Sequence, residues 1–193
     1  MTWGECKTAT LQKMFTSEDE GAEDYLAAMP QAANEAIQMI ATTEAGKHIR
    51  SHDTLTKDPA QSRTFDLEDE LIDFLNVGDF ETYCMDGDEP RPVSLKLLGG
   101  HLLVVPKGIE SVLVYYNAKP ARITENTPDA QEIDLPEDAA ALVPMYMASQ
   151  LYKDDDLAIA TTYRNEFETA FERLQNRQAE NIDTEFTSES GWW

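Results

Sequence analysis

The sequence predicts an α+β fold: an α-helical bundle of N-terminal helices and two C-terminal helices, with a small antiparallel β insert and an extended C-terminal arm. Apolar residues recur at helical spacing near both ends of the 193-residue chain. Short runs of β-forming residues, separated by turn sequences, occupy its middle. We therefore expect bundle helices in residues 1–46, a linker and β-rich insert in 47–124, bundle helices in 125–177 and the arm in 178–193.

Two helical patterns occupy the N-terminal segment. Thr2 and Glu5 have the spacing of a capping box, which predicts the start of the first helix. The second helix carries apolar side chains at i, i+3 and i+4 spacing over residues 25–40. Pro30 lies within it, and an interior proline removes a backbone hydrogen bond. We therefore expect a kink or break near Met29.

The middle of the chain changes character after Gly46. Residues 47–62 are polar and keep no period, so we expect a loop or ribbon there. A short helix is expected within residues 66–76. Runs of β-forming residues, bounded by turn sequences such as Gly99-Gly100, predict strands at 80–85, 93–98, 101–105 and 111–116.

The C-terminal segment has the clearest helical pattern. Pro136 followed by two acidic residues is typical of a helix start. The acidic triplet 154–156 can cap a last helix, whose apolar residues repeat with a period near 3.5. We expect the side chains of that repeat to lie in the core, among them Leu157, Phe167, Phe171 and Leu174.

Charge, hydropathy and cysteine content argue against nucleic-acid-binding, membrane and secreted proteins. The chain has 15 Lys and Arg against 37 Asp and Glu, a net charge of −22, so phosphate backbones and anionic lipid would repel it. Its apolar stretches are much shorter than the ~20 residues that span a bilayer, and the N-terminal residues do not resemble a secretory signal. Two cysteines, Cys6 and Cys84, are expected to be reduced thiols of a protein made in a cytoplasm.

Metal and cofactor sites are not expected. His48 and His52, four residues apart and followed by Asp53, would resemble metal ligands on a helix, but their segment lacks a helical pattern. The acidic turn 86–89 lacks the ligand spacing of an EF-hand loop, so a hairpin turn is the better interpretation. Helix capping accounts for residues 154–156 without a metal ion.

Sequence motifs of catalysis are missing too. The chain contains no Gly-rich phosphate loop, no G-x-S-x-G elbow and no H-E-x-x-H motif. Paired carboxylates occur throughout because the chain is acidic, so they carry no evidence for general acid–base catalysis. We therefore do not expect an enzyme.

Three segments together suggest a family. The order of helices, β insert and two final helices, with the sequences of residues 29–41, 112–123 and 133–168, resembles the head-to-tail adaptor (connector) proteins of tailed bacteriophages. The likeness extends from about Thr2 to Leu174.

This resemblance implies a structural virion protein of the neck, between capsid and tail, made in the host bacterial cytoplasm and without a cofactor. Each copy would join neighbouring copies in a ring, expected to be dodecameric, bind the portal protein and carry a tail or neck protein below. Genomic DNA would pass through the channel without specific binding, and no membrane is involved. Segments 1–46 and 125–193 carry −18 of the net charge, which could line such a channel or form a solvated surface.

The arm is the expected interaction segment. Its aromatic residues Phe186, Trp192 and Trp193 would contact the portal or a neighbouring subunit, because tryptophan is a favoured interface anchor. The alternative is that both tryptophans fold back onto their own helices. Two other functions remain open: another neck, head-completion or tail-side virion component, and a small cytoplasmic enzyme or ligand-binding module.

Overall fold

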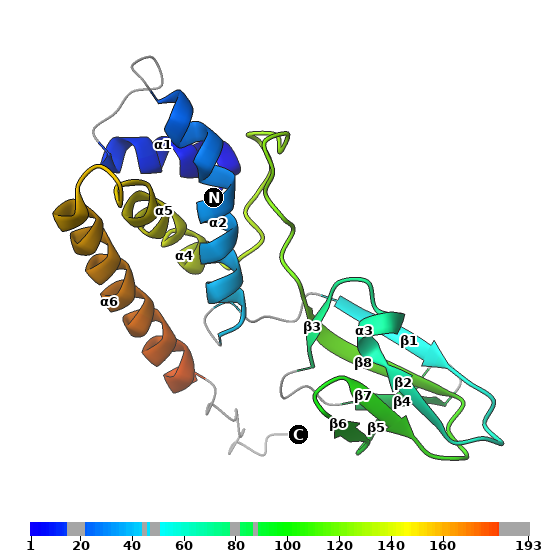
Figure 1. Cartoon of the computed structure of the whole chain (residues 1–193). Helices are drawn as coiled ribbons and strands as arrows, with labels where there is room; N and C mark the ends of the chain where they lie inside the picture. Colours follow the sequence, from blue (N-terminus) through cyan, green and yellow to red (C-terminus); the bar gives the residue numbers. More distant parts are fainter. Residues whose placement is uncertain (15–21, 44–45, 47–50, 78–81, 87–88, 182–193) are drawn as a thin grey trace, which may run out of the picture. The chain divides into compact units, whose positions relative to one another are not determined.

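The computed structural model describes residues 1–14, 22–43, 46, 51–77, 82–86 and 89–181 (Figure 1). The chain forms two compact units, a helical unit and a β unit. The helical unit comprises Met1–Gly46 and Ala121–Trp193, and the β unit is the intervening Lys47–Pro120. The chain therefore leaves the helical unit once and returns to it.

The elements of the helical unit come from both ends of the chain. They are α1 (Trp3–Lys13), α2 (Glu23–Ala41), α4 (Glu137–Ala140), α5 (Val143–Leu151) and α6 (Leu157–Asn181). The capping box that the sequence predicted starts α1: the Thr2 hydroxyl accepts from the Glu5 backbone N–H at 3.2 Å, and the Glu5 carboxylate accepts from the Thr2 N–H at 2.8 Å. In α6 the helix continues past residue 177, where the arm was expected to begin.

α2 is continuous, so of the kink or break expected near Met29, the break is wrong. The helix includes Pro30 in its interior. Met29 and Ala33, on either side of the proline, are both fully buried in the core of the helical unit. Burial of one face on both sides of Pro30 offsets the lost backbone hydrogen bond, so the helix continues through the proline.

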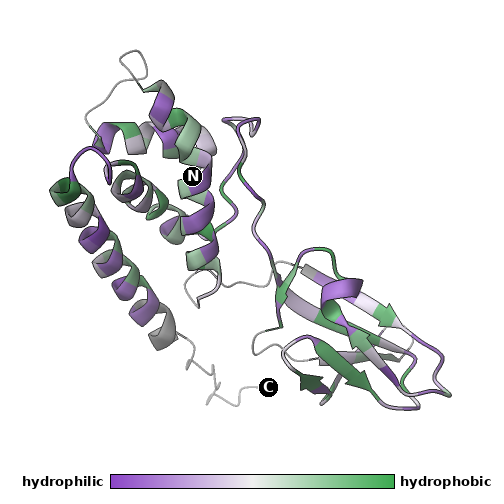
Figure 2. Cartoon of the chain, in the orientation of Figure 1, coloured by the Kyte–Doolittle hydropathy of each residue, from purple (hydrophilic) through white to green (hydrophobic). Residues whose placement is uncertain are grey.

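α5 is the most buried helix of this unit. It packs against α1, α2 and α6, and Val143, Met147 and Ala148 are fully buried. Figure 2 shows its hydrophobic residues among the surrounding helices. Small side chains on α2, such as Ala33 and Ala36, let that helix approach α5 closely.

Where the chain returns to the helical unit, the side chain of Asn34 binds the backbone of Ile123, a contact that we call the Asn34 clamp. The Asn34 side chain on α2 accepts from the Ile123 N–H at 2.9 Å and donates to the Ile123 carbonyl at 2.7 Å. Ile123 itself is buried in the helical core. The Asn34 side-chain amide thus makes the two backbone hydrogen bonds that a neighbouring strand would make in a sheet. It satisfies the N–H and carbonyl of Ile123, which would be costly to bury without a partner.

The β unit holds two antiparallel sheets. Its elements are β1 (Ser51–Thr56), β2 (Arg63–Asp66), α3 (Leu67–Glu70), β3 (Phe74–Asn76), β4 (Thr82–Asp86), β5 (Glu89–Val93), β6 (Lys96–Leu98), β7 (Leu102–Val105) and β8 (Ser111–Ala118). The larger sheet has the order β1-β8-β4-β5, with β3 also paired to β8, and the smaller has the order β2-β7-β6. β8 is the longest strand and pairs with β1, β3 and β4.

The expected fold class, a mostly helical bundle with a small insert, is therefore wrong. Within the described residues the strands fill two sheets that enclose a core of their own, which includes Phe65, Leu103, Val112 and Val114. The protein is a mixed α and β structure in which the β unit, Lys47–Pro120, is a second compact unit with two sheets rather than a small insert.

Two local expectations for the β unit are met only in part. The polar stretch expected to be a loop or ribbon contains a regular strand, β1, whose six residues pair with β8 from Ser51 to Thr56. Of its described side chains, 52–56, Leu55 alone enters the core, so the sequence shows little alternation. The short helix expected within 66–76 is a single turn, α3, and the chain then forms β3. The Gly99-Gly100 turn does lie between β6 and β7, with φ angles of 62° and 83° that favour glycine.

Substitution of Phe167 should destabilise the helical unit. Its ring is fully buried and lies 5.3 Å from that of Tyr146. Phe167→Ala should lower the free energy of unfolding by ~3–5 kcal/mol. Leu157→Ala, on the same helix but 69% exposed, should change it by less than about 0.5 kcal/mol. Urea titration followed by circular dichroism at the helical band measures both, and equal losses would contradict the assignment.

The Asn34 clamp predicts a second stability difference. Asn34→Ala leaves the Ile123 N–H and carbonyl without their partner, which should cost ~1–3 kcal/mol. Gln38→Ala, an exposed position of the same helix, is the matched control and should be nearly neutral. Amide hydrogen exchange at Ile123 should accelerate in the first variant only. Unchanged protection there would show that the clamp does not hold this segment.

The two thiols should differ in reactivity. Cys6 is fully buried, with its Sγ 3.5 Å from Met147 Sδ, and burial raises the pKa of the thiol to about 12. Cys84, on β4, is half-buried. A disulfide reagent at pH 8 should therefore label Cys84 in the native protein and Cys6 only after denaturation. Rapid labelling of a Cys84→Ser variant under native conditions would contradict this.

Candidate functional site

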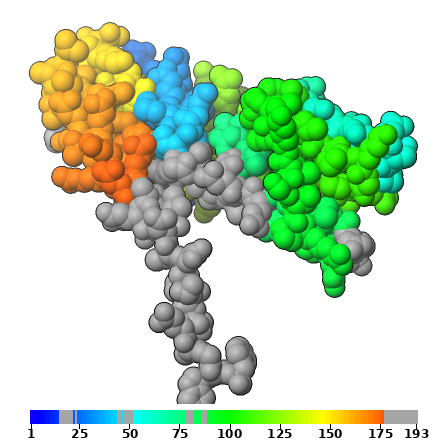
Figure 3. All heavy atoms as spheres, turned by 90° about the horizontal axis from the view of Figure 1, so that it is seen from below, coloured from blue at the N-terminus to red at the C-terminus, as the bar shows by residue number. Residues whose placement is uncertain are grey.

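Over residues 157–176, the buried side chains of the last helix form one stripe. Ala160, Phe167 and Leu174 are buried and Phe171 is half-buried, whereas most residues between them are exposed. α6 packs against α5 and α4 through this stripe. In Figure 3 the atoms of α6, in orange, form an open surface of the helical unit.

Leu157 does not share this environment. It was expected in the core with Phe167, Phe171 and Leu174, but its side chain is 69% exposed. Leu157 is the first residue of α6, directly after the capping residue Asp156, and the buried stripe begins only at Ala160. The apolar repeat therefore starts one turn later than the sequence suggested.

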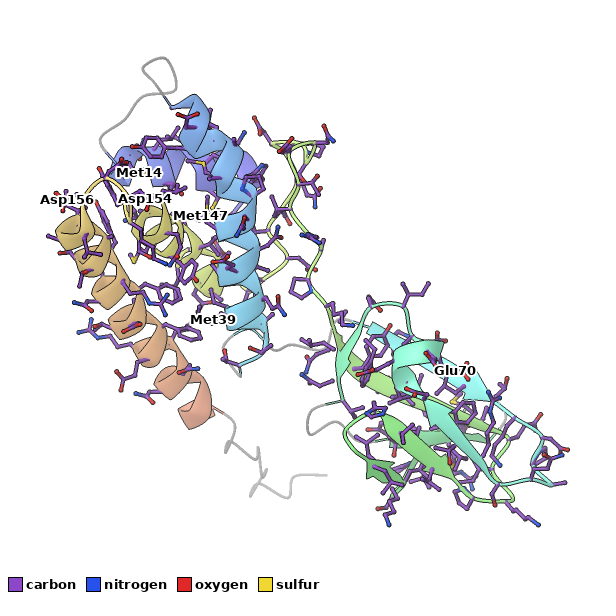
Figure 4. The ribbon with its side chains drawn as sticks, viewed as in Figure 1. Met14, Met39, Glu70, Met147, Asp154 and Asp156 are labelled. Carbon is purple, nitrogen blue, oxygen red and sulfur yellow. The ribbon has the colours of Figure 1, made fainter. Side chains whose placement is uncertain are left out.

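Two residues of the acidic triplet before α6 accept hydrogen bonds within the helical unit. Asp156 Oδ1 accepts from the Ala158 and Ile159 N–H groups at 2.9 and 3.1 Å, as an N-cap does. The Asp155 carboxylate accepts from the Tyr25 hydroxyl, and this hydrogen bond raises the pKa of Tyr25. Figure 4 labels Asp154 and Asp156 at this turn. The triplet thus joins the start of α6 to the start of α2.

A pair of tyrosines fixes the same turn to α1. The Tyr152 and Tyr163 rings stack at 6.3 Å with an interplanar angle of 11°. Tyr152 donates its hydroxyl to the Met14 carbonyl at 2.7 Å, and Tyr163 donates to the Lys13 carbonyl at 2.6 Å. Burial raises the pKa of both hydroxyls, which keeps them protonated as donors. Two carbonyls at the end of α1 are satisfied in this way.

A shallow groove lies between α5 and α6. It has a volume of about 290 Å³ and is lined by Ser149, Gln150, Lys153, Leu157, Ala160, Thr161 and Arg164. The Arg164 guanidinium already pairs with Glu168 at 2.7 Å and lies 5.1 Å from the Tyr146 ring centre. Ser149 donates its hydroxyl to the Tyr146 carbonyl at 2.7 Å. These polar groups serve the packing of the two helices.

The histidine pair considered from the sequence does not form a described site. His48 lies outside the described residues, while His52 is exposed on β1. Asp53 follows it on the same strand, so the two side chains point to opposite faces of the sheet. In the acidic turn 86–89, β4 and β5 pair as a hairpin up to Asp86 and Glu89, and residues 87 and 88 lie outside the described part.

Among the described residues, no group of three or more His, Cys, Asp or Glu side chains is placed to hold a metal ion.

The outer face of the larger sheet is an aromatic surface that sequence reasoning missed. The ring of Tyr115 on β8 lies 5.4 Å from that of His52 on β1 and 6.0 Å from that of Tyr83 on β4. Leu113 lies on the same face, two residues before Tyr115. The alternation within residues 111–116 could have shown that Leu113 and Tyr115 face away from the core. Their cross-strand neighbours depend on pairings that the sequence does not show.

The predicted interaction residues Phe186, Trp192 and Trp193 lie outside the described residues. Their contacts with a portal or a neighbouring copy remain a prediction.

The described helices include none that is both long enough and apolar enough to cross a membrane. A search of curated proteins gave no match.

The resemblance to phage adaptors rested on an order of N-terminal helices, a β insert and C-terminal helices, and the described structure has α1 and α2 before the β unit and α4, α5 and α6 after it. The chain matches the family described as SU10 adaptor protein over residues 1–185, a range that includes both units. The match confirms the resemblance and indicates a structural component of the virion rather than an enzyme. This chain belongs to the SU10 adaptor protein family, a family of phage structural adaptor proteins.

Proposed function

We propose that this protein is one subunit of a head-to-tail adaptor ring, which binds the portal vertex of the capsid and carries a tail or neck protein below it. The family match over residues 1–185 is the observation that carries the proposal. It includes both units and nearly the whole chain, so the function it suggests applies to the protein as a whole. We expect twelve subunits in the ring.

The charge distribution supports passage of DNA without binding. The helical unit holds 24 acidic and 7 basic residues, a net charge of −17, while the β unit holds 13 and 8, a net charge of −5. A channel lined by helices of this charge would repel the phosphate backbone rather than retain it. The genomic DNA would therefore pass through the channel of the ring without specific contacts.

The C-terminal residues are the proposed portal contact. Phe186, Trp192 and Trp193 follow α6 in a segment, 178–193, that contains four acidic residues and no Lys or Arg. Aromatic side chains supply most of the binding energy of many interfaces, and an extended segment can add a strand or insert a side chain into a partner. We propose that this segment binds the portal or a neighbouring subunit.

Truncation tests this proposal. A variant that lacks residues 189–193 should keep the melting temperature of the full chain but fail to co-sediment with purified portal or to attach to portal-containing heads. The matched control, Ser188→Ala with Ser190→Ala, keeps both tryptophans and should bind normally. Normal binding of the truncated chain would refute the proposal that the C-terminal arm contacts the portal. A large fall in its melting temperature would instead show that the tryptophans fold back onto their own helices.

A further inference from the structure

The outer face of the five-stranded sheet differs from the rest of this acidic chain. The strand registers place on it a set of side chains without a single Asp, Glu, Lys or Arg among the described residues. They are His52, Thr54, Thr56, Tyr83, Met85, Pro90, Pro92, Ser111, Leu113 and Tyr115. Charged residues make up 27% of the sequence, so a continuous uncharged face across four strands is a specific feature of this sheet.

The chemistry of this face is that of an interface centre. Tyr115 is half-buried between His52 and Tyr83, with ring centres at 5.4 and 6.0 Å. Leu113 and Met85 are also half-buried. Aromatic residues and methionine are enriched, and charged residues depleted, at the buried centres of protein–protein interfaces. The opposite face of β8, with Val112 and Val114, already fills the core of the β unit, so packing within that core does not explain the outer residues.

Charge indicates which partner suits this face. Copies of a protein with a net charge of −22 repel one another, and the repulsion is greatest between the helical units, which carry −17 each. The β unit carries −5, and its uncharged face adds no like charge at the point of contact. Contact through this face therefore adds no charge of its own to the repulsion between two copies.

We propose that the outer face of the larger sheet, centred on Tyr115, is the contact between neighbouring copies of this chain. This rests on the proposed ring, and it specifies which surface joins the subunits. Contacts between neighbours in a ring are heterologous, so the face would meet a different surface of the next copy. Burial of the Tyr115, Tyr83 and Leu113 side chains would provide the apolar part of that contact.

Site-specific photo-crosslinking tests the partner directly. A photoreactive phenylalanine replaces Tyr115 in assembled neck complexes, and mass spectrometry identifies what it reaches. The expected product joins two copies of this chain. The same residue in place of Lys96, exposed on the smaller sheet, is the control and should give this product at least tenfold less often. Crosslinks from position 115 to portal or tail proteins, equal yields at the two positions, or no crosslink in assembled necks would each overturn the proposal.

Substitution provides a second, independent measurement. Tyr115→Glu should reduce ring formation on portal at least tenfold without lowering the melting temperature of the free protein, whereas Tyr115→Phe should assemble normally. Normal assembly of Tyr115→Glu would overturn the proposal. If even the unmodified chain formed no ring and bound no portal, the proposed function itself would fail. A ring that forms but makes its contacts elsewhere would leave the proposed function intact.

Discussion

Burial of α5 is the interaction on which the helical unit depends. α1 from the beginning of the chain, α2 after it and α6 from the end all pack against this one helix, so segments more than a hundred residues apart share a core. Met147 illustrates this, because its sulfur contacts the Cys6 thiol and accepts the Thr10 hydroxyl at 3.7 Å from α1. The β unit is inserted between α2 and α4, and the helical core closes only when the chain has returned from it.

Side-chain hydrogen bonds fix the positions of the segments that pack around α5. The Asn34 amide holds the returning chain at Ile123, and the hydroxyls of Tyr152 and Tyr163 hold the end of α1. Each of these contacts satisfies backbone groups at a place where regular secondary structure begins or ends. The helical unit thus combines an apolar core with side-chain hydrogen bonds at the ends of its helices and at the returning segment.

The two units differ in the charge and the surfaces that they present. The helical unit carries most of the negative charge, and over residues 157–176 the buried side chains of its last helix form one stripe. The β unit carries little net charge and presents an aromatic sheet face. Repulsion from DNA and contact between subunits would make opposite demands on a surface, so the proposed function would gain from placing them in different units of one chain.

The sequence by itself determined the helices with a strong period, the helix caps and the family. Thr2 with Glu5 and Asp156 with the residues after it act through neighbours three residues away or closer, and such local effects are visible in a sequence. The continuity of α2 through Pro30, the strand β1 and the size of the β unit were decided only in the tertiary structure. Burial of Met29 and Ala33 in the helical core keeps α2 continuous through Pro30, and β1 is a strand because β8, some sixty residues away, pairs with it. A local sequence pattern reflects interactions between neighbouring residues. These three features depend instead on the apolar area that is buried against distant segments and on hydrogen bonds with them.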